Sequence, residues 1–184
     1  MKFPDSELWR YSTQVYQITD VEDSCLQLQN QFDADVNILL YCCWAGDKTH
    51  TLNNEEISAL QTVSNPWQNI LKPLRDARQM MKQHVIPIPA DQRQQTVTNM
   101  SELEINAEHM AQLALEDCID ITTKTASTEL SNAECCAQNL FTYLQLLTTV
   151  NAINDITEYV STLLNAIYQD DEAVQMALMV AATS

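Results

Sequence analysis

Four basic side chains at helical spacing are the residues of this chain best suited to chemistry. Lys72, Arg75, Arg78 and Lys82 follow one another at intervals of three or four residues, so a helix would present them along one stripe. The chain has a formal net charge of -16, and a cluster of cations within it needs a counter-charge. Either internal carboxylates neutralise the stripe, or it binds an anion or an acidic partner. We take these four residues as the candidate anion- or partner-binding site, with internal neutralisation as the open alternative.

Two pairs of carboxylates have spacings that could serve a metal ion. Glu116 and Asp120 lie one helical turn apart and Asp155 lies near Glu158, so the pairs could hold magnesium as acidic clusters do in helical isoprenoid synthases. This chain is much shorter than those enzymes and lacks both a full aspartate-rich motif and its partner motif. A solvated acidic face explains the carboxylates better, and we expect no metal and no cofactor.

The three histidines show no metal-binding pattern. His50, His84 and His109 lie far apart in the sequence. Glu108 with His109 lacks the Glu-x-x-His step of di-iron bundles, because position 106 is Asn. The histidines therefore indicate no catalytic or metal site.

The cysteines are typical of a reducing compartment. Four of the six cysteines stand in two adjacent pairs, and adjacent cysteines supply neither a disulfide framework nor a Cys-x-x-Cys metal site. We predict reduced core residues at Cys25, Cys42, Cys43, Cys118, Cys135 and Cys136. The chain begins without an apolar signal region, and no apolar stretch approaches the roughly 18 residues of a membrane span. We therefore expect a cytoplasmic protein.

The composition predicts an all-α protein. One glycine and five prolines leave few turns, and 46% apolar residues are enough for a hydrophobic core. The net charge argues against nucleic acid and against a membrane surface as partners. Charge is also uneven, since residues 94–184 contain thirteen Asp/Glu but only one cation, Lys124. We expect the second half to form an acidic helical hairpin or bundle.

The most apolar segment, residues 36–44, is predicted to be a buried central helix. It is apolar on nearly every side, which is typical of a helix inside a protein. Asp35 is suited to cap its start, and Gly46 is suited to end it as a left-handed residue. We predict that an N-terminal bundle of four or five helices packs around this segment.

Capping signals place the other helices of the first half. One helix is expected over residues 5–18, and Asp20 is suited to cap the next. Asn53 with Glu56 resembles a capping box. Pro66 is expected to start a further helix, because proline is favoured in the first turn and disfavoured later.

Residues 85–90 contain two prolines and are expected to form an extended connector. We place a boundary here, between an N-terminal helical bundle at 1–88 and an acidic helical region at 89–184. The second region either stands apart or packs on the first as a single globular unit.

Further helices are expected beyond the connector. A long helix should run from residue 91 to about 124, or begin instead at Ser101. Ser131 opens a capping-box pattern. Apolar residues at steps of three and four over 153–167 form a coiled-coil-like seam, and a short helix over about 173–182 should end the chain.

Several short motifs follow one another in the first half. They are Leu-Trp-x-Tyr-Ser from Leu8, Cys-Leu-x-Leu-Gln from Cys25, Asp-Val-Asn-x-Leu-Leu-Tyr-Cys-x-Trp from Asp35, and Pro-Trp from Pro66 with Lys-Pro-Leu-Arg from Lys72. Over residues 5–85 the chain resembles an uncharacterised family of small bacterial all-helical proteins, a domain of unknown function. The resemblance carries no established activity, substrate or catalytic residue.

The sequence is best interpreted as that of a non-catalytic interaction or adaptor protein, which binds a protein partner or forms a homo-oligomer through helical faces. The alternative is a small helical enzyme of the hydrolase or transferase type with a carboxylate-bound divalent metal. An adaptor needs an exposed apolar seam or charge patch, whereas an enzyme needs a concave pocket with convergent polar groups.

Overall fold

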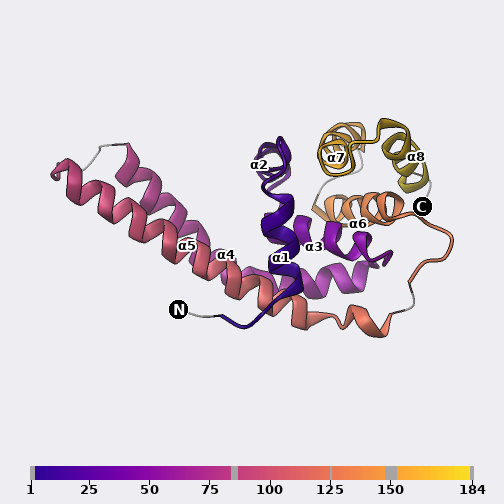
Figure 1. The fold of residues 1–184 in the computed structure, drawn as a ribbon, viewed down its shortest axis with the longest axis horizontal. Helices are drawn as coiled ribbons and strands as arrows, with labels where there is room; N and C mark the ends of the chain where they lie inside the picture. The colour runs from indigo at the N-terminus through magenta and orange to yellow at the C-terminus, as the bar shows by residue number, and fades with distance from the viewer. Residues whose placement is uncertain (1–2, 84–86, 125, 148–152, 183–184) are drawn as a thin grey trace.

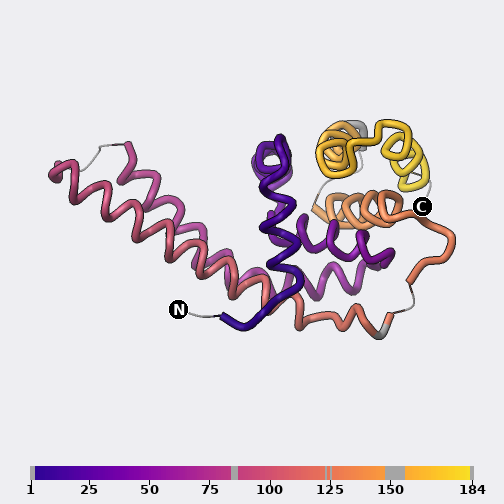
Figure 2. The backbone as a smooth tube through the Cα atoms, in the orientation of Figure 1, coloured from indigo at the N-terminus to yellow at the C-terminus, as the bar shows by residue number. Residues whose placement is uncertain are grey.

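The fold is all-α, as the composition predicts. The computed structural model describes residues 3–83, 87–124, 126–147 and 153–182, and within them there are helices and connecting segments but no strand. None of these helices has both the length and the apolar character needed to cross a bilayer. The elements are α1 (Glu7–Val15), α2 (Val21–Phe32), α3 (Val36–Asp47), α4 (Asn54–Lys82), α5 (Ala90–Cys118), the 3-10 helix η1 (Ile121–Thr123), α6 (Asn132–Leu147), α7 (Ile153–Tyr168) and α8 (Asp171–Ala181). The far halves of α4 and α5 project from the body as an antiparallel arm (Figure 1; Figure 2).

α3 lies at the centre of the body, as its apolar sequence predicts. Every residue from Asn37 to Gly46 is buried, and α3 contacts α1, α2, α4, α5 and α6. Asp35 caps the helix as expected, because its Oδ1 accepts a hydrogen bond from the Asn37 N–H at 2.9 Å. Its Oδ2 accepts one from the Ser64 hydroxyl of α4, and its backbone N–H donates to the Tyr143 hydroxyl of α6 at 2.7 Å. The start of α3 is thus tied to two neighbouring helices.

The role predicted for Gly46 is wrong. Gly46 lies inside α3 without a left-handed backbone, and the left-handed residue beyond the helix is Thr49, with a φ of 57°. A Cβ on Gly46 would lie only 2.5 Å from the backbone N and the Sγ of Cys136 in α6. Glycine is required here because α3 and α6 approach closely, and not because the chain turns.

A buried amide fixes the contact between α3 and α6. Asn139 of α6 is fully buried, and its Nδ2 donates to the carbonyl oxygens of Cys42 and His50 at 3.1 and 2.9 Å. Its Oδ1 accepts a hydrogen bond from the Leu52 N–H at 2.7 Å. One side chain therefore satisfies buried backbone groups of α3 and of the segment that leads to α4.

The apolar core is continuous across the body. Buried side chains from Leu8 in α1 to Ala181 in α8 belong to one cluster. α7 and α8 cover the side of α6 that faces away from α3 (Figure 1), and the seam predicted in α7 is buried at Ile156 and Val160. The predicted boundary at residue 88 lies between the two helices of the arm, at its tip.

The prediction that Pro66 starts a new helix is wrong. α4 runs without interruption through Pro66 and Pro73. Proline removes one backbone donor, but Leu60 and Leu71 are fully buried on either side of Pro66, and their packing holds the intervening backbone helical.

Other helix limits differ from the expectations in smaller ways. α5 begins at Ala90, so the predicted start near residue 91 is confirmed and the alternative start at Ser101 is wrong. The predicted end near residue 124 is also wrong, because α5 ends at Cys118 and the short helix η1 follows. α1 ends at Val15, three residues earlier than expected. Part of the predicted connector, residues 84–86, lies outside the described residues.

Besides Asp35, two predicted N-caps are confirmed and one is wrong. Asn53 with Glu56, and Ser131 with Glu134, form the reciprocal hydrogen bonds that open α4 and α6. Asp20 precedes α2, but its backbone is left-handed with a φ of 73° and its side chain makes no capping hydrogen bond.

The cysteines form no disulfide, as predicted. Five of the six are buried and Cys118 is half-buried. Burial raises the pKa of Cys25 to about 12 and that of Cys135 to about 11, so both thiols are protonated at neutral pH.

We predict that Gly46→Ala destabilises the protein by about 2 kcal/mol or more, because the added methyl overpacks the contact with α6. Helix propensity alone predicts that the same substitution stabilises the protein, because alanine is favoured over glycine by about 1 kcal/mol inside a helix. Urea unfolding followed by circular dichroism measures the change. Asp47→Ala, at the exposed end of α3, is the control and should alter the free energy of unfolding by less than about 0.5 kcal/mol. A Gly46→Ala protein at least as stable as wild type would contradict the close approach.

Candidate functional site

Two cations of the predicted stripe are paired inside the arm. Arg78 binds Glu104 through two nitrogens, Nε at 2.6 Å and Nη2 at 3.1 Å. Arg75 binds Glu108 through Nη2 at 2.6 Å and Glu104 through Nε at 3.3 Å. The hydrogen bond with Glu104 raises the pKa of Arg78. Carboxylates of the acidic half thus neutralise these two arginines.

The other two cations of the stripe lie on the surface. Lys72 and Lys82 are exposed, and Lys72 makes no ion pair with any residue that the structure describes. Lys82 is the last residue of α4, at the far end of the arm. The structure therefore brings Arg75 and Arg78 together and places Lys72 and Lys82 on the surface, and the binding role of the four residues stays a prediction.

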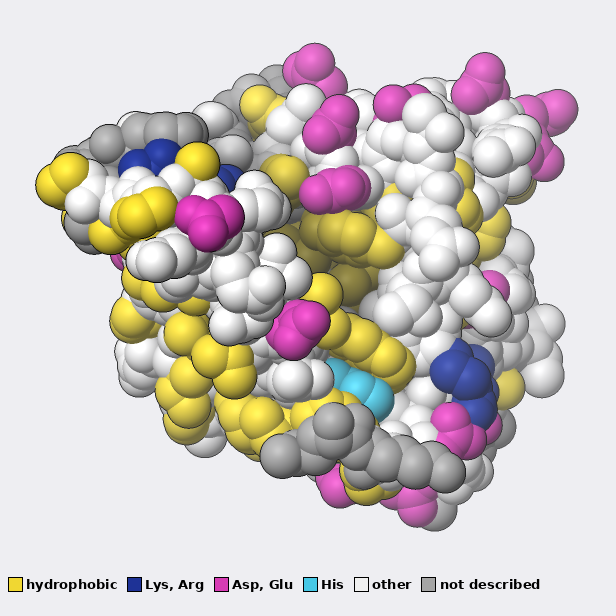
Figure 3. Space-filling model, turned by 60° about the vertical axis from the view of Figure 1, so that its left-hand side comes forward, with side chains coloured by type: hydrophobic (Ala, Val, Ile, Leu, Met, Phe, Trp, Pro, Cys, Tyr) yellow, Lys and Arg dark blue, Asp and Glu magenta, His cyan; other side chains and the backbone are white. Residues whose placement is uncertain are grey.

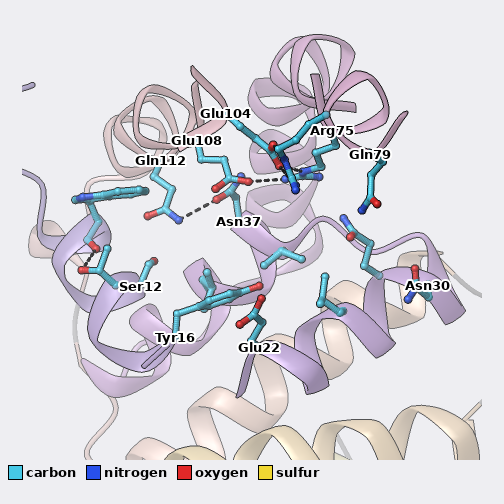
Figure 4. Close-up of a pocket in the computed structure, with 17 residues that line it drawn as sticks. Ser12, Tyr16, Glu22, Asn30, Asn37, Arg75, Gln79, Glu104, Glu108 and Gln112 are labelled. Carbon is cyan, nitrogen blue, oxygen red and sulfur yellow. Dashed lines mark hydrogen bonds and ion pairs between the residues drawn. The ribbon is translucent and has the colours of Figure 1, made fainter. Parts of the chain in front are cut away.

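A cleft of about 670 Å³ lies between the arm and the body. α4 and α5 contribute Arg75, Gln79, Glu104, Glu108 and Gln112, the facing helices α1 and α2 contribute Ser12, Tyr16, Glu22 and Asn30, and α3 contributes Val36, Asn37 and Leu40 (Figure 4). The space-filling view shows a hollow with apolar side chains at its bottom and acidic side chains around its mouth (Figure 3). Sites for small molecules have volumes of roughly 300–1,000 Å³, so the cleft is large enough for a ligand.

Two buried polar side chains of the cleft have atoms without a hydrogen-bond partner. Gln112 of α5 is 2% exposed, and its Nε2 donates to Asn37 Oδ1 at 2.8 Å, whereas its Oε1 bonds to no described residue. Ser12 of α1 is 3% exposed, and its Oγ likewise has no partner in the described part of the chain. Buried polar atoms are normally paired, so these two are groups with which a ligand can bond.

An aromatic stack borders the cleft. Trp9 of α1, a lining residue, lies parallel to His109 of α5, with ring centroids 4.4 Å apart and an interplanar angle of 4°. Phe3 also packs against His109, at a centroid distance of 4.8 Å. Burial lowers the pKa of His109, because a partly enclosed imidazole is less stable when charged. The stack fixes α1 against α5 and so positions one side of the cleft.

The carboxylates considered as metal ligands lie apart from this cleft. Glu116 accepts hydrogen bonds from a hydroxyl and a backbone N–H at the start of α1, and Asp120 caps η1. Glu158 is exposed on α7, whereas His84 and the side chain of Asp155 lie outside the described residues. Among the side chains that are described, no three His, Cys, Asp or Glu gather as a group able to hold a metal ion.

The sequence shows little of the cleft. Asn37 is the exception, since a polar residue within an apolar helix needs a partner and so suggests a buried contact. Ser12 and Gln112 resemble polar residues of surface helices, because their burial depends on how α1 meets α5. The pairing of Glu104 with Arg78 follows from the register of the arm, which the sequence pattern does not fix.

The lining of the cleft falls entirely within residues 9–112. Comparison with protein families matches residues 7–115, more than half of the chain, to the family described as Protein of unknown function (DUF2390). The chain belongs to this family. The DUF2390 match confirms the resemblance to an uncharacterised family, and it extends beyond residue 85 to Leu115 in α5. It includes the cleft and excludes α6, α7 and α8. Comparison with curated proteins and with solved structures gave no match.

We predict that Arg78→Gln lowers the free energy of unfolding by about 2 kcal/mol. The change removes two charge-assisted hydrogen bonds and leaves the largely buried Glu104 short of a counter-charge. Lys72→Gln removes the same charge from an exposed position of the same helix, and it should change stability by less than about 0.5 kcal/mol. Urea titrations of both variants measure the difference. Equal losses would mean that the ion pairs of the arm add nothing beyond net charge.

We predict that His109 contributes to the pH dependence of stability. Its pKa is lowered in the folded protein, so the unfolded chain takes up the proton first as the pH falls below the ordinary value of about 6.5. Protonation therefore favours unfolding, and the free energy of unfolding should fall less in His109→Gln than in wild type between about pH 7.5 and pH 5.5. Denaturant titrations across that range test it, and parallel curves for the two proteins would contradict it.

Proposed function

We propose that the protein is a non-catalytic interaction protein that binds a partner protein through its arm. The observation that supports this proposal is the apolar surface of the arm. Of the nine exposed large apolar side chains among the described residues, five lie on α4 and α5, with exposures of 36–56%: Ile70, Met80, Leu103, Ile105 and Met110. Apolar side chains concentrated on a projecting hairpin are typical of an interaction surface.

Three of these side chains form what we call the arm face, defined by Ile70, Leu103 and Met110. Leu103 and Met110 are seven residues apart and so lie on one face of α5. The ion pairs that link α4 to α5 set the register of the antiparallel helices, and this register places Ile70 close to the level of Met110. None of the three lines the cleft. Apolar side chains gather over the arm in the space-filling view (Figure 3).

The positive charges of the arm favour a partner with acidic residues. The arm carries five of the nine Lys/Arg of this acidic chain: Lys72, Arg75, Arg78, Lys82 and Arg93. A partner helix with an apolar face flanked by carboxylates complements both the arm face and these cations. In this proposal Lys72 contacts the partner, while Arg75 and Arg78 hold α4 against α5.

We also place the protein in the cytoplasm of a bacterium. Six cysteines without a disulfide support a reducing compartment, and the resemblance of the first half is to small bacterial proteins. The net charge of -16 argues against nucleic acid and anionic lipid as partners. Association through helical faces needs no cofactor.

We predict that the double substitution Ile70→Gln and Leu103→Gln removes partner binding and leaves the fold intact. Both side chains are about half exposed, so their replacement removes little buried area. The partner is captured with tagged wild-type protein from its own cells, purified, and titrated by calorimetry. Loss of two contact residues should raise Kd at least about tenfold, which corresponds to a loss of roughly 1.4 kcal/mol of binding free energy.

The matched control is Met176→Gln with Met179→Gln, two exposed methionines of α8 in the body. This variant should keep the wild-type Kd. Equal binding by wild type and the arm variant, or a loss confined to the α8 variant, would contradict the proposal. Sedimentation of the wild-type protein alone shows whether the partner is a second copy, because self-association should then disappear with the arm substitutions.

A further inference from the structure

The charges that line the cleft are not balanced. Arg75 and Arg78 form ion pairs with Glu104 and Glu108 on the same wall. Glu22 of α2 lines the opposite wall, and no described residue makes an ion pair with it. Two cations and three carboxylates therefore line the cleft, which leaves one negative charge in excess. A ligand with positive charge would balance it.

The buried polar atoms of the cleft favour the same kind of ligand. Gln112 uses its amide nitrogen on Asn37, so its unpaired atom is a carbonyl oxygen, which can only accept a hydrogen bond. The unpaired hydroxyl of Ser12 can also accept one. An ammonium group carries three donors and no acceptor, which matches an amide oxygen, a hydroxyl and a carboxylate.

Aromatic and apolar side chains complete the lining. Trp9 and Tyr16 lie on the α1 wall, and Val36 and Leu40 lie on α3. Aromatic faces attract organic cations, and an apolar surface accommodates methylene groups. A bare inorganic cation would use none of this surface, whereas an alkyl chain with ammonium groups would use all of it.

We propose that the cleft binds a linear alkyl polyamine, with one ammonium group at Glu22 and another at Gln112 and Ser12. Gln112 lies on the α5 wall, and Ser12 and Glu22 lie at different places along the facing wall formed by α1 and α2 (Figure 4). A ligand that carries charges at both ends of an apolar chain can therefore place one charge between Gln112 and Ser12 and the other at Glu22. The site does not depend on the arm face or on the function proposed for it. The lysine side chain of a peptide offers the same ammonium chemistry, and the experiment separates the two sources.

Calorimetric titration of the full chain with spermidine tests the site. Salt at about 150 mM screens the general attraction between a polycation and an acidic protein. We expect saturable binding of one spermidine per chain. A peptide blocked at both ends and containing one lysine should bind at least about tenfold more weakly, because it carries a single ammonium group. Tighter binding of the peptide would overturn the polyamine assignment.

Glu22→Gln and Asp23→Asn form a matched pair of variants. Both residues are exposed neighbours on α2, and each change removes one negative charge, but only Glu22 lines the cleft. Glu22→Gln should weaken spermidine binding about tenfold, and Asp23→Asn less than about twofold. Equal weakening by both, no effect of Glu22→Gln, or binding that never saturates would overturn the proposal. The arm variant should bind spermidine like wild type, so this site and the proposed function can fail separately.

Discussion

The arrangement of the body depends on the close approach of α3 to α6 at Gly46. A methyl group at that position would collide with the backbone of Cys136, so the helices meet only because one of them lacks a side chain there. The approach allows the Asn139 amide to reach carbonyl groups of α3 and of the following segment, and the Tyr143 hydroxyl to reach the start of α3. Both ends of the central helix are therefore held by α6, and the remaining helices cover what these two leave open.

The cleft follows from how α5 returns to the body. α5 leaves the arm, crosses α1 at the stack of Trp9 on His109, and reaches α3 through the hydrogen bond from Gln112 to Asn37. The ion pairs of Arg78 with Glu104 keep α4 beside it in the arm. Because one helix serves both the arm and the body, the arm has a fixed place relative to α1 and α2, and the space between them becomes a site with defined walls.

The parts of the fold that local chemistry determines could be predicted, and those that depend on packing could not. The helical class, the buried segment around α3 and the capping boxes at Asn53 and Ser131 depend on composition, periodicity or short-range hydrogen bonds. The predictions for Gly46 and Pro66 were wrong because glycine commonly ends a helix and proline commonly starts one. In this protein, tertiary contacts override both local preferences. Most of the cleft is of the second kind, since Ser12 and Gln112 acquire their burial only when distant helices meet.

The part of the chain beyond the family match, α6 to α8, has a structural task. The DUF2390 segment contains every residue of the cleft but ends before α6, which covers one side of α3, the helix whose residues from Asn37 to Gly46 are buried. Residues 7–115 alone would expose that side to water and leave without partners the backbone groups that Asn139 satisfies. α6 supplies the missing cover, and α7 and α8 in turn cover α6. The segment that forms the cleft therefore depends for its core on the part of the chain that contributes nothing to the cleft itself.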